Sequence, residues 1–344
     1  MRTWTLPGLS VAFFGLILPA LCEEKPAPEA AREIQRIQTG SLATGLAISP
    51  DGKTLALSGP GLLILLHEIP SGDRLGSMDD DHAGEMFVTY DLEFSPDGKT
   101  LFSIGSEGAR NWNATEAELA APFFRNQGGF SMKVVGDKPI PDTGNDLAVS
   151  PDGKLLATID AEGRVNLRDL TAPPKPGKEW PALRSLPAET GKASFLAFTP
   201  DANKGLLVQG GGGITLWDPA TGKLLAKVET PGGPLAVSPD GKRLAVGEGS
   251  GKIRLYDLKT LKETQTFEGH TQQARALAFS RDGKLLASGS MDGTVRLWEA
   301  GSGKPNGTLK AHEGGVLETA FSPDGKLLAT SGLDGTVALW ELGE

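Results

Sequence analysis

The pentapeptide Ser-Pro-Asp-Gly-Lys decides the architecture of this chain, because it recurs along nearly the whole length. A variant with Arg in the second position stands at Ser280–Lys284, and a degraded copy, TPDANK, begins at Thr199. The intact copies are Ser49–Lys53, Ser95–Lys99, Ser150–Lys154, Ser238–Lys242 and Ser322–Lys326. Successive aspartates of the seven copies are 39 to 55 residues apart. A period of about 40–50 residues indicates a repeat architecture.

The pattern within each repeat predicts four short antiparallel strands. A strand such as LAFS precedes the turn, where Pro ends the ladder and Asp-Gly allows the chain to reverse. A second apolar strand follows, then a tight turn such as Met291-Asp292-Gly293, a third strand such as TVRLW, and a fourth strand after a Ser-Gly or Thr-Gly turn. One such sheet cannot cover both of its apolar faces, whereas sheets stacked radially can do so.

The two ends of the repeat region predict how the stack closes. The last repeat reaches only its third strand, which ends at Trp340-Glu341. A strand-sized segment, Arg32–Gly40, lies ahead of the first repeat without a sheet of its own. We expect residues 32–40 to complete the last sheet, so that the first and last parts of the repeat region are joined.

Two repeats share a set of four polar and aromatic side chains at identical spacing. Indole, hydroxyl, imidazole and carboxylate groups can form one continuous hydrogen-bonded chain, because each can satisfy the next. The sets are His270, Ser288, Asp292 and Trp298, and, 42 residues later, His312, Thr330, Asp334 and Trp340. The other repeats depart from this pattern, and the third has Arg168 where Trp is expected.

These sets and turns resemble those of the WD-repeat β-propellers, over essentially all of residues 32–344. The resemblance implies an all-β, seven-bladed propeller with four-stranded antiparallel blades, closed by pairing the N-terminal strand with the last blade. It also implies that the two tetrads are structural. Ser288, His270 and Asp292 superficially resemble a catalytic triad, but the same set recurs in the next repeat, which favours a structural role.

The N-terminal residues predict export. Met1-Arg2 is followed by an apolar run from Leu6 to Cys22 with small residues near its end, which is typical of a secretory signal. We therefore expect residues 1–22 to be a signal peptide, residues 23–31 a Pro-rich tether, and the protein to be periplasmic or secreted. Membrane association is expected only if this segment stays uncleaved or if Cys22 is lipidated.

Composition excludes several classes of function. The formal net charge is −9, whereas a nucleic-acid-binding protein needs a basic face to neutralise phosphates. One cysteine among 344 residues excludes a disulfide scaffold, a Cys-rich zinc module and an iron–sulfur cluster. Nucleophile-elbow, Walker and HExxH motifs do not occur. We expect a non-enzymatic scaffold with a protein or peptide partner and no cofactor.

One group of carboxylates supports an enzymatic alternative. Internal register places Asp91, Asp146 and Glu318 at the same position of three inner strands, and Glu93 replaces an alanine found in the other six repeats. If these groups converge at the mouth of a central channel, they could bind Ca²⁺ or Mg²⁺. The alternative function is then a metal-assisted hydrolase or lactonase, since propeller lactonases and related hydrolases use metal or carboxylate sites in this region.

The candidate partner surface lies at the ends of the strands opposite the repeated turns. In WD-repeat proteins partners often use this face. Most residues predicted there are small, and the exceptions gather in the last two repeats. Apolar groups beside an Arg suit an interface hot spot. The candidate partner-binding residues are Arg275, Met291, Leu317, Leu333 and, in the second repeat, Tyr90.

Overall fold

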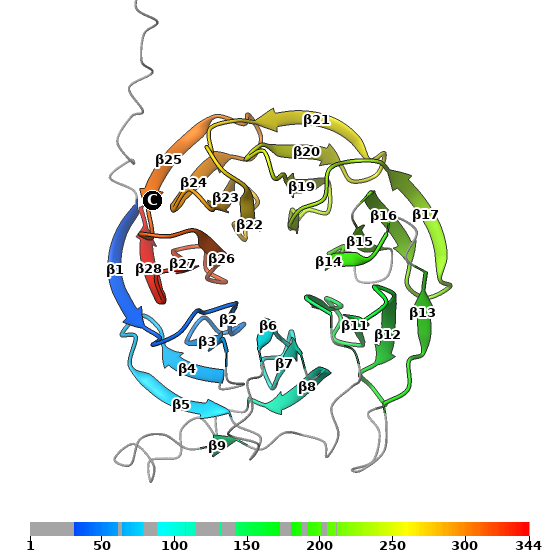
Figure 1. Cartoon of the computed structure of the whole chain (residues 1–344), viewed down its shortest axis with the longest axis horizontal. Helices are drawn as coiled ribbons and strands as arrows, with labels where there is room; N and C mark the ends of the chain where they lie inside the picture. Colours follow the sequence, from blue (N-terminus) through cyan, green and yellow to red (C-terminus); the bar gives the residue numbers. More distant parts are fainter. Residues whose placement is uncertain are drawn as a thin grey trace, which may run out of the picture.

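The described part of the chain is built from β-strands alone. The computed structural model describes residues 31–60, 64–78, 88–106, 108–114, 131–132, 142, 144–172, 180–187, 191–200, 205–210 and 212–343. Their strands form seven sheets arranged in a ring (Figure 1). The predicted all-β propeller is confirmed. The predicted signal peptide, residues 1–22, lies outside the described residues, as does the predicted tether except Ala31, which belongs to the first strand.

The sheets, or blades, follow one another along the chain. Blade 1 comprises β2 (Gly45–Ile48), β3 (Thr54–Ser58), β4 (Ile64–Glu68), β5 (Arg74–Met78) and β9 (Ser131–Met132). Blade 2 comprises β6 (Thr89–Phe94), β7 (Thr100–Gly105) and β8 (Gly108–Asn113). Blade 3 comprises β10 (Leu147–Val149), β11 (Leu155–Ile159), β12 (Val165–Asp169) and β13 (Arg184–Leu186).

The second half of the ring is more regular. Blade 4 comprises β14 (Ala193–Phe198), β15 (Leu206–Gly210), β16 (Gly213–Asp218) and β17 (Lys223–Val228). Blade 5 comprises β18 (Leu235–Val237), β19 (Arg243–Gly247), β20 (Ile253–Asp257) and β21 (Lys262–Phe267). Blade 6 comprises β22 (Ala274–Phe279), β23 (Leu285–Ser290), β24 (Thr294–Glu299) and β25 (Pro305–Lys310). Blade 7 comprises β26 (Val316–Phe321), β27 (Leu327–Gly332), β28 (Thr336–Leu342) and β1 (Ala31–Gln38).

The prediction of four strands in all seven blades is wrong. Six sheets contain at least four strands, but blade 2 has three within the described residues, and blade 1 has five. The extra strand, β9, pairs in parallel with the outer strand of blade 1, where Ser77 lies opposite Ser131. Within the described ranges, β9 therefore lies at the edge of blade 1 and not beside β8 of blade 2.

The repeated turns hold their shape through hydrogen bonds inside the motif. In the first copy, Ser49 Oγ donates to Asp51 Oδ1 (2.5 Å), and the same oxygen of Asp51 accepts from the backbone N–H of Lys53 (3.0 Å). Ser49 Oγ also accepts from the N–H of Thr54, at the start of the next strand (2.9 Å). Gly52 has a φ of 75°, which an L-residue rarely adopts. The motif thus encodes its own geometry.

The strand order gives the ring two different faces. The repeated turns, between the first and second strands, lie at the same end of each blade as the turns between the third and fourth. We call this end the turn face. The hairpins between the second and third strands lie at the opposite end, which we call the hairpin face.

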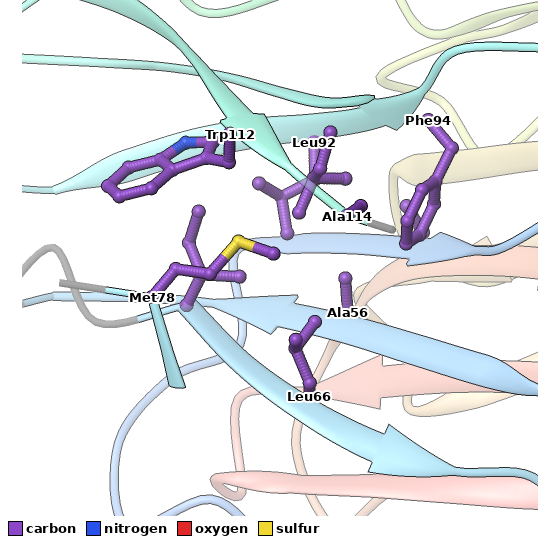
Figure 2. Close-up of a cluster of buried hydrophobic side chains, with 10 residues drawn as sticks. Ala56, Leu66, Met78, Leu92, Phe94, Trp112 and Ala114 are labelled. Carbon is purple, nitrogen blue, oxygen red and sulfur yellow. The ribbon is translucent and has the colours of Figure 1, made fainter. Parts of the chain in front are cut away.

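The hydrophobic core lies between neighbouring blades. Between blades 1 and 2, Leu66 and Met78 pack with Leu92 and Trp112 in one cluster (Figure 2). Met78 and Leu66 are fully buried and Trp112 is nearly so. Each blade therefore covers one face of its neighbour, which is why a single sheet would not be stable alone.

The N-terminal strand closes the ring. β1 pairs antiparallel with β28, from Ala31 opposite Leu342 to Gln38 opposite Thr336 (Figure 1). Ile37 is buried in a cluster with Val337 and Leu339. The guanidinium of Arg36 donates to Thr336 Oγ1 and to the carbonyl of Ala311, both at 3.0 Å.

Weakening this closure should destabilise the whole ring. Deleting residues 32–40 removes one strand from blade 7 and should markedly lower the melting temperature. As a point test, Ile37→Ala should lower the free energy of unfolding by about 2–4 kcal/mol, because it leaves a cavity in a buried cluster. Chemical denaturation followed by circular dichroism measures both effects. The exposed neighbour Gln38→Ala is the control, with a change within about 0.5 kcal/mol. An unchanged melting temperature in the deletion would contradict closure by β1.

Candidate functional site

The four predicted side chains of blade 6 form one hydrogen-bonded chain. The indole N–H of Trp298 donates to Ser288 Oγ (2.8 Å), which lies 2.8 Å from His270 Nε2. His270 Nδ1 lies 3.0 Å from Asp292 Oδ2. Burial lowers the pKa of His270, so the imidazole is neutral, accepts from Ser288 and donates through Nδ1 to Asp292.

The carboxylate of Asp292 ends this chain. Burial alone would raise its pKa, but hydrogen bonds from Thr294 and the backbone N–H of Thr271 outweigh that effect and lower the pKa to about 2. Every donor in the blade 6 set therefore has an acceptor, and the set links the segment before β22 to β23 and β24.

Blade 7 repeats this arrangement and connects it to the closing strand. Trp340 Nε1 donates to Thr330 Oγ1 (3.1 Å), and the same oxygen lies 3.0 Å from His312 Nε2. His312 Nδ1 lies 3.0 Å from Asp334 Oδ1. Arg36, on β1, lies 3.9 Å from Asp334, so the closing strand adds a positive charge beside the tetrad.

Blade 3 replaces the tetrad by a buried ion pair. Arg168 occupies the position of the Trp, opposite Leu156, as Trp298 lies opposite Leu286 in blade 6. Its guanidinium forms an ion pair with Asp142, and both side chains are almost fully buried. Thr158 donates to the same carboxylate, and Asn166 donates to its other oxygen at 3.0 Å. The sequence shows the missing Trp but not this partner, because Asp142 stands in a long connection with no repeat register.

In blades 2, 4 and 5 the aromatic residue at the Trp position is hydrogen-bonded to one hydroxyl group. Trp112 Nε1 donates to Ser103 Oγ in blade 2 (2.9 Å), and Trp217 Nε1 donates to Thr215 Oγ1 in blade 4 (2.9 Å). In blade 5 the hydroxyls of Tyr256 and Thr230 are hydrogen-bonded at 2.8 Å. Only blades 6 and 7 combine His, Asp, hydroxyl and Trp among the described residues.

Four of the five candidate partner residues are exposed or half-buried on the hairpin face, and the fifth, Leu317, is buried. Leu333 is 40% exposed and Arg275 is exposed, while Met291 and Tyr90 are half-buried. Leu317 is buried at 8% exposure, so its prediction as an exposed contact residue is wrong. Arg275, Leu317 and Tyr90 each stand at a β-bulge of their inner strand, where a side chain can be redirected. At Leu317 the apolar side chain turns inward, as the hydrophobic effect favours.

Three of these residues belong to one surface, and the structure adds a fourth. Met291 lies against Gly315, and Leu333 lies against Gly314, so blades 6 and 7 meet there. The backbone of Ser41 lies beside Gly335, which brings the neighbouring Leu42, 36% exposed, to the hairpin that carries Leu333. We call Arg275, Met291, Leu333 and Leu42 the upper rim. Leu42 was not predicted from the sequence, because this residue stands outside the repeats. Tyr90 lies in blade 2, apart from this group.

Similarity to a known protein family is found in the same two blades. The family model described as "WD domain, G-beta repeat" matches residues 261–299 and 303–341, which hold both tetrads. Blades 6 and 7 therefore carry WD repeats, within a ring of sheets that has the form of a β-propeller. Proteins of this family generally mediate contacts between proteins and are typically non-enzymatic.

Two curated relatives carry the same repeats. The WD repeat-containing protein VIP3 of Arabidopsis thaliana is 28% identical over 225 residues, which cover 59% of this chain and 63% of VIP3. The uncharacterized WD repeat-containing protein sll1491 of Synechocystis is 32% identical over 106 residues, 30% of this chain and 28% of the relative. The matched part thus spans less than two thirds of either relative.

Carboxylates on the inner strands bind backbone groups of the next blade. Asp91, on β6, accepts from the N–H of Leu147 (3.2 Å), and Glu93 accepts from the N–H of Val149 (2.7 Å). Asp146 accepts from the N–H of Leu196 (2.6 Å). These bonds join blade 2 to blade 3 and blade 3 to blade 4. The shared register of these residues can be predicted from the sequence, but their backbone partners cannot.

Burial raises the pKa values of the same carboxyl groups. Burial raises the pKa of Glu93 to about 8, and the charge of Asp91 adds to this effect. Burial and the charge of Asp91 also raise the pKa of Asp146 well above its usual range. The carboxyl groups of Asp91 and Asp146 are hydrogen-bonded to each other, which requires that one of them carry a proton.

The structure does not bring the predicted metal ligands together as a set. Within the described ranges, no group of three or more His, Cys, Asp or Glu side chains is placed to hold a metal ion. Burial raises the pKa of Glu318 well above its usual range. The charge of Asp91 raises this pKa further, whereas the charge of Arg275 lowers it. Carboxyl groups that keep their protons and bind backbone N–H groups are poor ligands for a hard cation.

The tetrads should contribute strongly to stability. Ser288→Ala removes the hydroxyl between Trp298 and His270 and leaves a buried N–H without an acceptor. We expect the free energy of unfolding to fall by about 2–4 kcal/mol, since each buried unsatisfied polar group costs about 1–3 kcal/mol. Urea denaturation measures this loss. Ser302→Ala, an exposed serine of the same blade, is the control and should change stability by less than about 0.5 kcal/mol. Equal effects of the two substitutions would contradict the role of the tetrad.

Glu93 should make stability depend on pH. Its pKa is about 8 in the folded protein and about 4.5 when unfolded, so the folded state binds the extra proton between these values. Raising the pH through this window therefore destabilises the native protein. Glu93→Gln keeps an acceptor for Val149 and removes the titration. Its stability relative to the native protein should rise between pH 4.5 and 8 by a few kcal/mol, because a tenfold difference in proton affinity corresponds to about 1.4 kcal/mol.

Denaturation in urea at a series of pH values tests this difference. Comparing the two proteins at each pH cancels the opposing contributions of His270 and His312, whose pKa values are lowered by burial. A constant difference in stability across the whole range would show that Glu93 is ionised in the folded protein.

Proposed function

We propose that this WD-repeat propeller is a non-enzymatic platform that binds a partner protein at the upper rim. The observation that carries the proposal is the grouping of exposed Leu333, Leu42 and Arg275 on one face of adjoining blades. Large apolar side chains beside an Arg are typical of the centres of protein interfaces. The hairpins of the other blades end in small residues such as Gly59, Ala161 and Gly249.

Two features of the upper rim support binding without rearrangement. Gly314 and Gly315 lie between Met291 and Leu333, so no side chain separates the two. The hairpins that carry Met291 and Leu333 are fixed by backbone hydrogen bonds, from Met291 to Gln273 (2.9 Å) and from Leu333 to Gly315 (2.8 Å). A preformed surface loses less conformational entropy on binding.

We also propose that the platform works outside the cytoplasm. The support is the signal-like segment from Met1 to Cys22. Among the described residues there is no helix long and apolar enough to span a membrane. Mass spectrometry of the secreted protein tests export: a mature chain that begins at Glu23 supports cleavage, whereas an intact or lipid-modified N-terminus would place the protein at a membrane.

The hydrolase alternative at Asp91, Asp146 and Glu318 finds less support, because Asp91 and Asp146 accept from backbone N–H groups and burial raises the pKa values of all three. We propose that the protein acts without Ca²⁺ or Mg²⁺. Calorimetric titration with either ion tests this: binding heat that is lost in Asp146→Asn would favour the metal site.

Reversing the character of the upper rim should abolish partner capture. The mature protein, residues 23–344, serves as bait in extracts of the cell envelope and culture medium, beside Arg275→Glu/Leu333→Asp. We expect a stoichiometric protein with the native bait and none with the double variant, because both charge and apolar contact are lost.

A matched control keeps this test specific. Leu225→Asp/Lys223→Glu changes an exposed leucine and an exposed lysine of blade 4 and should retain capture. Circular dichroism confirms that all baits are folded. Capture that survives the upper-rim substitutions would refute this surface.

A further inference from the structure

The turn face carries a ring of contacts between prolines and glycines. In five of the repeated turns the proline packs against the glycine of the next turn around the ring. A Cβ built on Gly98 would lie 3.4 Å from Pro50, and one on Gly153 would lie 3.6 Å from Pro96. The same contact joins Pro200 to Gly241 (3.8 Å), Pro239 to Gly283 (3.6 Å) and Pro323 to Gly52 (3.6 Å).

This ring of contacts is interrupted between blades 6 and 7. Blade 6 has Arg281 where the other six turns have proline. The glycine that would receive that proline, Gly325, has no neighbouring atom within 4 Å of the place where a Cβ would stand. The interruption therefore leaves open space between the two turns.

A groove of about 1260 Å³ lies at this interruption. Arg281 and Gly325 both line it, together with Leu285 of blade 6 and Leu342 of blade 7. Both leucines are partly exposed, so the groove has apolar surface as well as charge. The volume exceeds the roughly 300–1,000 Å³ typical of pockets for small molecules, so it suits a chain segment.

The acidic groups of the groove are already engaged. Glu299 accepts from Ser302 Oγ (2.6 Å) and Glu341 from Arg32 (2.9 Å), whereas Asp282 and Asp324 are bound by their own turns. Asp282 accepts from Ser280 Oγ (2.8 Å) and the N–H of Lys284 (3.0 Å). Asp324 accepts in the same way from Ser322 and Lys326. These carboxylates are therefore held toward the backbone.

The basic groups are less engaged. Arg281 is exposed and has no hydrogen bond or ion pair with any residue that the structure describes. Lys284 is 82% exposed and its ion pair with Asp282, at 3.1 Å, is solvated and weak. Arg32, at the start of the closing strand, is 75% exposed and forms an ion pair with Glu341 at 2.9 Å, which is also solvated and weak. The groove thus offers cationic donors from both blades around an apolar floor.

We propose that this groove binds an acidic peptide segment of a partner protein, with Arg281 receiving a carboxylate. A guanidinium can donate two parallel hydrogen bonds to a carboxylate, and the partly exposed leucines can receive an apolar side chain next to it. A nucleic acid is a poor occupant, because the net charge of −9 repels a polyanion. The site lies on the turn face, opposite the upper rim, so it extends the proposed platform to a second contact and does not rest on the first.

Fluorescence anisotropy tests the groove with a defined probe. The probe is a fluorescein-labelled peptide of alternating Leu and Asp or Glu, and its neutral counterpart has Asn and Gln in place of the acids. The native protein should bind the acidic peptide more tightly at low salt than at high salt and should bind the neutral peptide at least about tenfold more weakly.

Two substitutions of Arg281 separate charge from shape. Arg281→Glu reverses the charge, and Arg281→Pro restores the residue found in the other turns, so it fills the space beside Gly325 without harm to the fold. Each should weaken binding at least about tenfold, with the melting temperature of Arg281→Pro unchanged or raised. Lys99→Glu, in the corresponding turn of blade 2, is the matched control and should bind like the native protein.

The result distinguishes this groove from the upper rim. Arg275→Glu/Leu333→Asp should bind the acidic peptide normally, whatever the outcome of partner capture. The proposal is overturned if the acidic peptide fails to bind the native protein, if Arg281→Glu binds it equally well, or if the neutral peptide competes on equal terms. Displacement of the peptide by inorganic phosphate alone would identify a phosphate site instead and would also overturn it.

Discussion

The serine hydroxyl of the repeated turn is the constraint on which the rest of the structure depends. In six turns it donates to the aspartate two residues later, and it accepts from the first N–H of the next strand. The hydroxyl therefore fixes the angle at which the second strand leaves the first. Because the turn is the same in most blades, the sheets present matching faces, and each can cover the next. The core between Met78 and Trp112 is one outcome of this matching (Figure 2).

The seams between blades are less uniform than the turns. Blades 6 and 7 use hydrogen-bonded tetrads that end in an aspartate, whereas blade 3 uses the buried pair of Arg168 and Asp142. Breaking a buried ion pair leaves an uncompensated charge and costs about 3–5 kcal/mol, so this blade tolerates little change at either residue. Blades 2 to 4 are further joined by carboxyl groups that accept from backbone N–H groups of the next inner strand. We propose that the pair of blades 6 and 7 binds partners on two faces, with the upper rim on one and the Arg281 groove on the other.

Local chemistry explains which features the sequence predicts and which it does not. The turns, the tetrads and the closing strand are visible because short motifs or repeat spacing determine them. The partner of Arg168 is not visible, since Asp142 lies outside any repeat, and Leu42 is missed for the same reason. Leu317 is placed wrongly because the sequence shows a position on an inner strand but not the direction of a side chain at a bulge. The groove at Arg281 depends on the absence of a contact, which becomes visible only when neighbouring turns are seen together.

We propose that recognition takes place on blades 6 and 7, where repeat regularity and exposed apolar groups coincide. Site-specific photo-cross-linking tests this placement most directly. A photoreactive amino acid replaces Leu333 in one preparation and the equally accessible Leu225 of blade 4 in another, and both are irradiated in envelope extract. We predict one specific cross-linked partner from position 333 and none from position 225. A partner that cross-links from position 225 and not from position 333 would contradict the account.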